Sequence, residues 1–123
     1  MVCYLVFIFF PVAGPYYVLA RPDPWFVDNL FARAVYDTLA TGSSYGAAFP
    51  SSHVAAAVAA TLSAGRGSRW LGWSLAVPTV LLTVAVVYCQ MHYGVDAIAG
   101  LLTGAGVTAL VERLDRQTAE VSP

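Results

Sequence analysis

The sequence has very little charge and no lysine. Charged residues make up 11% of its 123 residues, against roughly 25% in an ordinary soluble domain, and all six basic residues are arginines. So few charges cannot cover a water-facing surface. The formal net charge of -1 also provides no basic face for a nucleic-acid backbone. These shortages argue against a typical soluble globular protein and against nucleic-acid binding.

Cysteine and histidine are scarce as well. Cys3 and Cys89 lie in apolar stretches without C-x-x-C spacing, which favours packing over a disulfide or a metal pair. His53 and His92 are the only two histidines.

The chain is rich in apolar residues: 59% of its residues are hydrophobic and 16 are aromatic. This composition excludes intrinsic disorder. Its length predicts a single membrane-embedded domain over residues 1–123.

Four hydrophobic segments stand out, and about 20 apolar residues suffice to cross a bilayer core. They cover residues 2–20, 50–64, 70–91 and 92–111. The predicted fold class is therefore all-α, a polytopic membrane helical bundle with about four transmembrane helices. A cleaved signal peptide is the alternative for the first segment, but no basic residue precedes it.

Glycine and proline mark special positions in these segments. Pro11, Gly14 and Pro15 interrupt the first one, which predicts a kink or break near its end whose backbone groups are satisfied by neighbouring protein or water. Gly100 and Gly104 form a small-xxx-small pattern, which favours close contact between helices.

The connection at residues 21–49 carries five of the thirteen charges. Part of it repeats apolar residues at three-to-four spacing, which predicts a short helix at the membrane interface. These residues are Trp25, Phe26, Leu30, Phe31, Ala34 and Val35. The remaining arginines predict the orientation, since Arg66, Arg69, Arg113 and Arg116 follow the second and fourth segments and favour the cytoplasmic side. Both histidines then lie at the outer face.

His92 and Asp96 form a His-x-x-x-Asp pair, and Asp96 is the only acid within the four segments. On a helix this spacing places both side chains on one face. A carboxylate that accepts a hydrogen bond from one ring nitrogen fixes the histidine tautomer and leaves the other nitrogen free to attack or to accept a proton. A purely structural hydrogen bond is the alternative.

The other histidine follows Pro50, Ser51 and Ser52 at the expected start of a helix. Free backbone N–H groups and the positive end of the helix dipole favour an anion there, and serine hydroxyls add donors. A phosphate group suits such a position, although serine is also a common helix N-cap. Because His53 and His92 are predicted on the same membrane face, the two motifs together favour a functional site.

These motifs resemble the type 2 phosphatidic acid phosphatase superfamily. Phe49 to His53, followed about forty residues later by His92 to Gly100, carries the resemblance, which covers about residues 45–112. The stretch from Phe10 to Pro15 is similar to the branch that contains inositol phosphorylceramide synthases. The resemblance implies a helical membrane enzyme that acts on lipid phosphate esters through a phosphohistidine intermediate. It also implies a role for each residue: His92 as nucleophile, Asp96 as its orienting partner, His53 as general acid, and Ser51 and Ser52 as phosphate-binding groups.

The sequence departs from the family pattern in three ways. Gly14 stands where the family has a lysine seven residues before Arg-Pro, so Arg21, with Arg33 as a second candidate, is expected to supply the cation for the phosphate. Ala85 and Val86 replace the Ser-Arg that commonly precedes the nucleophilic histidine. The family generally has six spanning helices, so the chain looks shortened at its N-terminus.

Several interpretations stay open at this stage. Water attacking the phosphohistidine gives a phosphatase, and an alcohol such as inositol gives a phosphotransferase. The alternatives are a catalytically inactive or partial membrane subunit and a bundle whose histidines bind haem or a metal. The main hypothesis requires no cofactor and no metal. Its expected partners are a lipid phosphate and the bilayer, without nucleic acid, and a homo-oligomer is left open. The expected location is a bacterial plasma membrane with the active site on the outer face.

Overall fold

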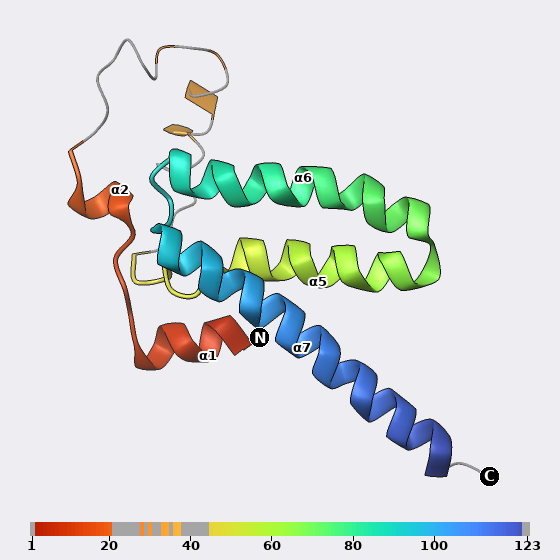
Figure 1. The fold of residues 1–123 in the computed structure, drawn as a ribbon. Coiled ribbons are helices and arrows are strands. Elements are labelled where there is room, and N and C mark those ends of the chain that lie inside the picture. The colour runs from red at the N-terminus through yellow and green to blue at the C-terminus, as the bar shows by residue number, and fades with distance from the viewer. Residues whose placement is uncertain are drawn as a thin grey trace.

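The computed structural model describes residues 2–20 and 45–121, and of the connection between them only residues 28, 30, 33, 34, 36 and 37. The named elements of the described part are all α-helices (Figure 1). Outside them, one isolated β-bridge pairs Val12 with Ala47. The helices are α1 (Val2–Phe9), α2 (Pro15–Val18), α5 (Ser52–Gly67), α6 (Arg69–Tyr88) and α7 (Gly94–Val121).

Helices α5 and α6 form an antiparallel hairpin (Figure 1). Ser51 caps the start of α5, where its hydroxyl accepts a hydrogen bond from the Val54 N–H at 3.5 Å. Ser68 makes the tight turn between the helices: its N–H donates to the Ala64 carbonyl at 2.9 Å and its hydroxyl accepts from the Leu71 N–H at 3.5 Å. The hairpin therefore places the start of α5 beside the end of α6.

Helix α7 packs against α5, whereas α6 and α7 contact each other much less. The approach is close, because a Cβ atom added to Gly100 would lie 2.6 Å from the Ser51 carbonyl oxygen. One added to Gly104 would lie 2.5 Å from the Ala55 carbonyl oxygen. The prediction that the small-xxx-small pattern permits helix contact is confirmed.

The protein interior is small and its outer surface is apolar. Buried Val54, Val86 and Ala97 form the core where α5 begins and α6 ends. Large apolar side chains along α6 point outward; Val80 and Leu81, for example, are each 63% exposed. Helices α6 and α7 are long and apolar enough to cross a membrane. Their apolar residues face the surroundings instead of a protein core, which fits a lipid environment better than water.

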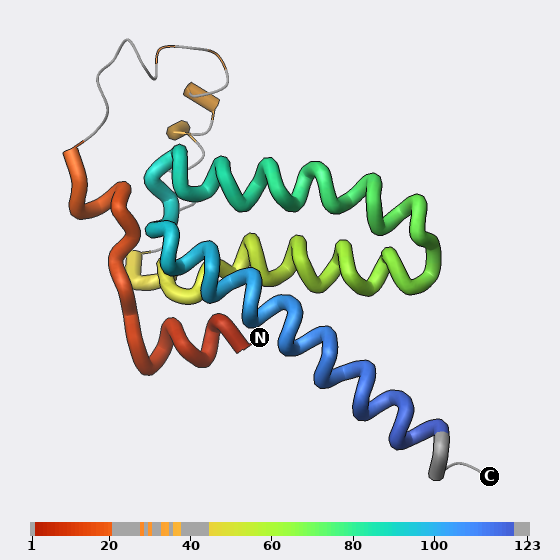
Figure 2. The backbone as a smooth tube through the Cα atoms, viewed as in Figure 1, coloured from red at the N-terminus to blue at the C-terminus, as the bar shows by residue number. Residues whose placement is uncertain are grey.

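The first hydrophobic segment does not form one continuous spanning helix. Helix α1 ends at Phe9 and α2 begins at Pro15, so the break lies where proline and glycine predicted it (Figure 2). The freed backbone groups are paired, since the Val12 N–H donates to the Gly46 carbonyl and the Ala48 N–H to the Val12 carbonyl, both at 3.1 Å. Of the two expected partners, protein or water, it is neighbouring protein that pairs with both backbone groups of Val12.

The other predicted segments correspond to helices with shifted ends. Helix α5 has 16 residues, fewer than α6 and α7, so among the described residues two helices, not the four expected, are long enough to span a membrane. Helix α7 continues past the predicted end at Val111 to Val121, through a polar stretch. The proposed interfacial helix lies mostly outside the described residues.

Candidate active site

Both histidines lie at the end of the bundle where α5 begins, α6 ends and α7 begins. His53 is in the first turn of α5, and His92 is in the short connection between α6 and α7. Their ring centroids are 6.1 Å apart, with an angle of 60° between the ring planes. Two residues separated by 39 positions in the sequence are therefore brought together by the α5–α6 hairpin.

His92 is buried, with 4% of its surface exposed. Its Nδ1 lies 2.7 Å from the carbonyl oxygen of Ala48. Because a carbonyl oxygen only accepts hydrogen bonds, Nδ1 carries the proton and donates it, which leaves the lone pair on Nε2. The imidazole thus has the tautomer that a nucleophile or base needs, and a backbone group fixes it.

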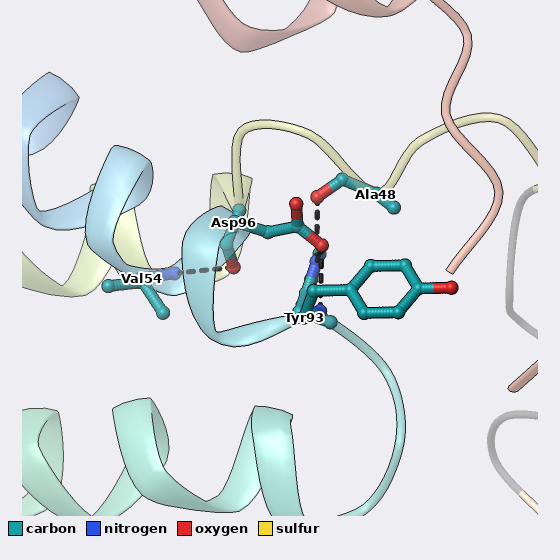
Figure 3. Close-up of polar contacts among 6 residues, drawn as sticks. Ala48, Val54, Tyr93 and Asp96 are labelled. Carbon is teal, nitrogen blue, oxygen red and sulfur yellow. Dashed lines mark hydrogen bonds and ion pairs between the residues drawn. The ribbon is translucent and has the colours of Figure 1, made fainter. Parts of the chain in front are cut away.

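Asp96 has a different position from the one expected. Its Oδ2 accepts a hydrogen bond from the Tyr93 N–H at 2.7 Å (Figure 3). The same oxygen lies 3.9 Å from Nδ1 of His92. Helix α7 begins at Gly94, so His92 precedes the helix, Tyr93 is its N-cap and Asp96 closes a capping-box bond. Nδ1 of His92 is therefore hydrogen-bonded to the Ala48 carbonyl and not to Asp96.

Ser51 and Ser52 differ in burial and in what their side chains contact. Ser51 is fully buried, caps α5 with its hydroxyl and donates its N–H to the Asp96 carbonyl at 3.0 Å, which ties α5 to α7. Ser52 is partly exposed and lines a cavity together with His53. Of the pair, Ser52 is the one whose side chain opens toward a ligand-sized space.

That cavity has a volume of about 440 Å³ and lies between α1, α5 and α7. Its lining is mostly apolar and includes Cys3, Tyr4, Ala56, Ala59, Gly104 and Val107. Ser52 and His53 come from the first turn of α5, and Ala56 and Ala59 follow one and two turns later. The polar side chains of Ser52 and His53 therefore lie beside an apolar space that suits a hydrocarbon chain.

The break between α1 and α2 supports the connection that carries His92. A Cβ atom on Gly14 would lie 2.6 Å from the Met91 carbonyl oxygen, and the Tyr16 N–H donates to the Gln90 carbonyl at 2.8 Å. Gln90 itself has a φ of 57°, in the left-handed region. Sequence reasoning missed this role of residues 14–16 and that of Ala48, because backbone contacts leave no residue pattern.

The expected phosphate cation Arg21 lies outside the described residues. Arg33, the second candidate, donates from Nε to Asp28 at 2.8 Å, so its charge is already paired. Within the described ranges, His, Cys, Asp and Glu form no group of three or more that could hold a metal. Cys3 and Cys89 are free thiols.

The described part of the protein is all-α, with two helices long and apolar enough to cross a membrane and two histidines close together at one end of the bundle. The chain belongs to the PAP2 superfamily, whose family model matches residues 1–110. This membership implies a phosphatase-like protein. Comparison with curated proteins and with solved structures gives no significant match.

Proposed function

We propose that this protein transfers the phosphoryl group of a lipid phosphate ester through a phosphohistidine formed on His92. The observation that supports this most strongly is the histidine pair, in which His92 presents Nε2 while Ala48 holds Nδ1 at 2.7 Å and His53 lies 6.1 Å away between ring centroids. PAP2 superfamily membership makes phosphate chemistry the expected use of such a pair.

In the proposed first step, Nε2 of His92 attacks phosphorus and the ester oxygen leaves with a proton from His53. In the second step, water or an alcohol attacks the phosphohistidine and returns its proton to His53. Ser52, the free N–H groups at the start of α5 and the cation Arg21 are proposed to stabilise the phosphate oxygens. Asp96 stabilises the positive charge that develops on the His92 ring. Water gives a phosphatase, and an alcohol gives a transferase of the inositol phosphorylceramide synthase type.

A lipid substrate is supported by the cavity beside His53. Its apolar walls, including Ala56, Ala59 and Val107, match a hydrocarbon chain better than a sugar or nucleotide.

We further propose that α5 and the α1–α2 segment lie in the bilayer with α6 and α7, giving four membrane segments. The histidine end then faces outward, because Arg66 at the end of α5, Arg69 at the start of α6 and the arginines in the last part of α7 lie at the opposite end.

Phosphate release from phosphatidic acid by the detergent-purified chain tests this function. The natural protein is expected to release phosphate and to incorporate acid-labile, base-stable phosphate, and His92→Ala is expected to lose both. Release that persists in His92→Ala would contradict the mechanism. No release and no labelling by the natural chain would instead favour an inactive or partial membrane subunit.

The cavity predicts chain-length selectivity. In Ala59→Leu the larger side chain fills part of the apolar space, so KM for a long-chain lipid phosphate is expected to rise about tenfold or more, since two displaced methylenes are worth roughly 1.6 kcal/mol. Hydrolysis of a short water-soluble phosphate ester should stay near the natural rate. Ala60→Leu, on the exposed side of the same helix and outside the cavity lining, is the matched control. Equal loss on both substrates would argue against a chain-binding role.

Two substitutions separate the capping role of Asp96 from its charge. Asp96→Asn keeps an oxygen that accepts from the Tyr93 N–H, so the thermal unfolding temperature should change little, whereas turnover should fall about 10- to 100-fold as the imidazolium loses a nearby carboxylate. Asp96→Ala also loses the cap and should cost roughly 1 kcal/mol of stability in addition. Unfolding curves and kcat, measured on both variants, distinguish the roles. Natural turnover in Asp96→Asn would show that the carboxylate serves only as a cap.

A further inference from the structure

A second hollow lies toward the end of the α5–α6 hairpin where the two helices are joined. It has a volume of about 380 Å³, and Arg66, Arg69 and Trp73 are among its lining residues. Arg69 is the first residue of the 20-residue helix α6, so roughly 30 Å of helix separates Arg69 from the end of α6 that precedes His92. A ligand bound here would not touch His53 or His92.

The two arginines in the hollow differ in their partners. Arg66, near the end of α5, forms an ion pair with Glu112 of α7. Arg69 makes no ion pair or hydrogen bond with any side chain in the described part of the protein. It also occupies the first position of α6, where the helix dipole is positive, and no acidic residue lies in that first turn. A cation at this helix end is unfavourable on its own, so the local field favours a bound anion.

The walls of the hollow indicate what kind of anion fits. Leu62 and Ala76 supply apolar surface, and Trp73 is 72% exposed beside the charged groups. Tryptophan next to arginine at the end of an apolar helix is typical of the region where headgroups meet hydrocarbon. A Cβ atom on Gly72 would lie 2.6 Å from Gly65 Cα, so the two backbones touch and no side chain covers the floor. The hollow therefore combines the positive charge of the two arginines with apolar surface.

We propose that this hollow binds the phosphate headgroup of an anionic phospholipid, with Arg69 as the principal ligand and Arg66 as a secondary one. The hydrocarbon chains of the lipid then lie along the exposed apolar surface of α6. Such a lipid would hold the α5–α6 turn at the membrane surface, and the binding is independent of the phosphoryl transfer proposed above.

Lipid-dependent thermal stability of the full chain in detergent tests the proposal. Phosphatidylglycerol is expected to raise the unfolding temperature of the natural protein, and phosphatidylcholine with the same acyl chains is expected to have less effect. In Arg69→Gln, the apparent affinity for phosphatidylglycerol should fall about fivefold, as expected for one basic residue beside an anionic lipid. Arg116→Gln removes the same charge from an exposed position of α7 outside the hollow and should bind as the natural chain does.

A second variant tests the proposal independently, in case Arg69→Gln does not fold. Ala76→Phe fills the hollow without changing charge and should also weaken phosphatidylglycerol binding. Equal affinity in Arg69→Gln and the natural chain, or an equal loss in Arg116→Gln, would overturn the proposal. Stabilisation by inorganic phosphate as large as that by phosphatidylglycerol would also overturn it, because a free anion would then be the ligand.

Discussion

Alanine at His53 is expected to slow phosphorylation of His92 by an alkyl phosphate about 10²- to 10⁴-fold and to leave phosphorylation by para-nitrophenyl phosphate within about tenfold of the natural rate. An alkoxide needs a proton as it leaves, and His53, 6.1 Å from His92 between ring centroids, is the group placed to supply it. A nitrophenolate leaves without one. Only the substrate with the poor leaving group should depend on His53.

Rapid-quench kinetics measure this difference directly. With para-nitrophenyl phosphate, His53→Ala should show a fast burst of about one nitrophenolate per active chain. Slow turnover should follow, because the attacking water then lacks its base and the phosphohistidine accumulates. With the alkyl phosphate no burst should be visible. His92→Ala, which removes the nucleophile, should show no burst with either substrate.

An equal reduction of both bursts in His53→Ala would contradict the general-acid role. His53 would then be needed for phosphate binding or for the geometry of the site, whatever the leaving group. His53→Gln separates these cases, because glutamine can still donate a hydrogen bond to a phosphate oxygen but cannot transfer a proton. A burst that His53→Gln restores for the alkyl phosphate would assign His53 to binding.

The helices could be predicted from the sequence where the apolar signal was long and uninterrupted. The segment predicted at 70–91 corresponds to α6 at Arg69–Tyr88, and the one at 92–111 to the first part of α7. Gly100 and Gly104 were recognised as a contact pattern because helix packing requires small residues at fixed spacing. In each case the decisive quantity, hydrophobicity or side-chain size, can be read from the residues alone.

The first segment shows where this reasoning fails. Its residues are apolar throughout, yet Pro11, Gly14 and Pro15 end α1 at Phe9, and the following backbone pairs with residues 46–48. The composition indicated a break but not its partner. Pairing between segments more than thirty residues apart depends on the whole fold, and backbone hydrogen bonds do not require particular side chains.

The candidate site was predictable in its side chains and not in its backbone. His53, His92 and Asp96 could be selected because ionisable residues are rare in apolar segments. The Ala48 carbonyl that fixes the His92 tautomer has no signature, since any residue offers a carbonyl. The hydrogen bond from the Tyr93 N–H to Asp96 was not foreseen because the start of α7 was placed two residues early; with Gly94 as the first helical residue, Asp96 occupies the capping position of that turn.

Gly104→Ala is expected to have the largest effect on stability among the helix-packing residues. The added methyl group would lie 2.5 Å from the Ala55 carbonyl oxygen and 3.0 Å from Val58 Cβ, so α5 and α7 must move apart. Overpacking of this kind costs about 1–3 kcal/mol, more than the roughly 1 kcal/mol that alanine gains over glycine in a helix. The thermal unfolding temperature in detergent should therefore fall.

Gly106→Ala provides the matched control, because a Cβ atom there would have no neighbour within 4 Å. Both substitutions add the same methyl group to the same helix, so the difference between them isolates the contact with α5. Gly106→Ala should unfold at or above the natural temperature. Equal unfolding temperatures for the two variants would contradict the close packing of α5 on α7.

The separation of α5 from α7 in Gly104→Ala should also move His53 away from His92. Gly104→Ala should therefore lose phosphoryl transfer at temperatures where it is still folded, and Gly106→Ala should not.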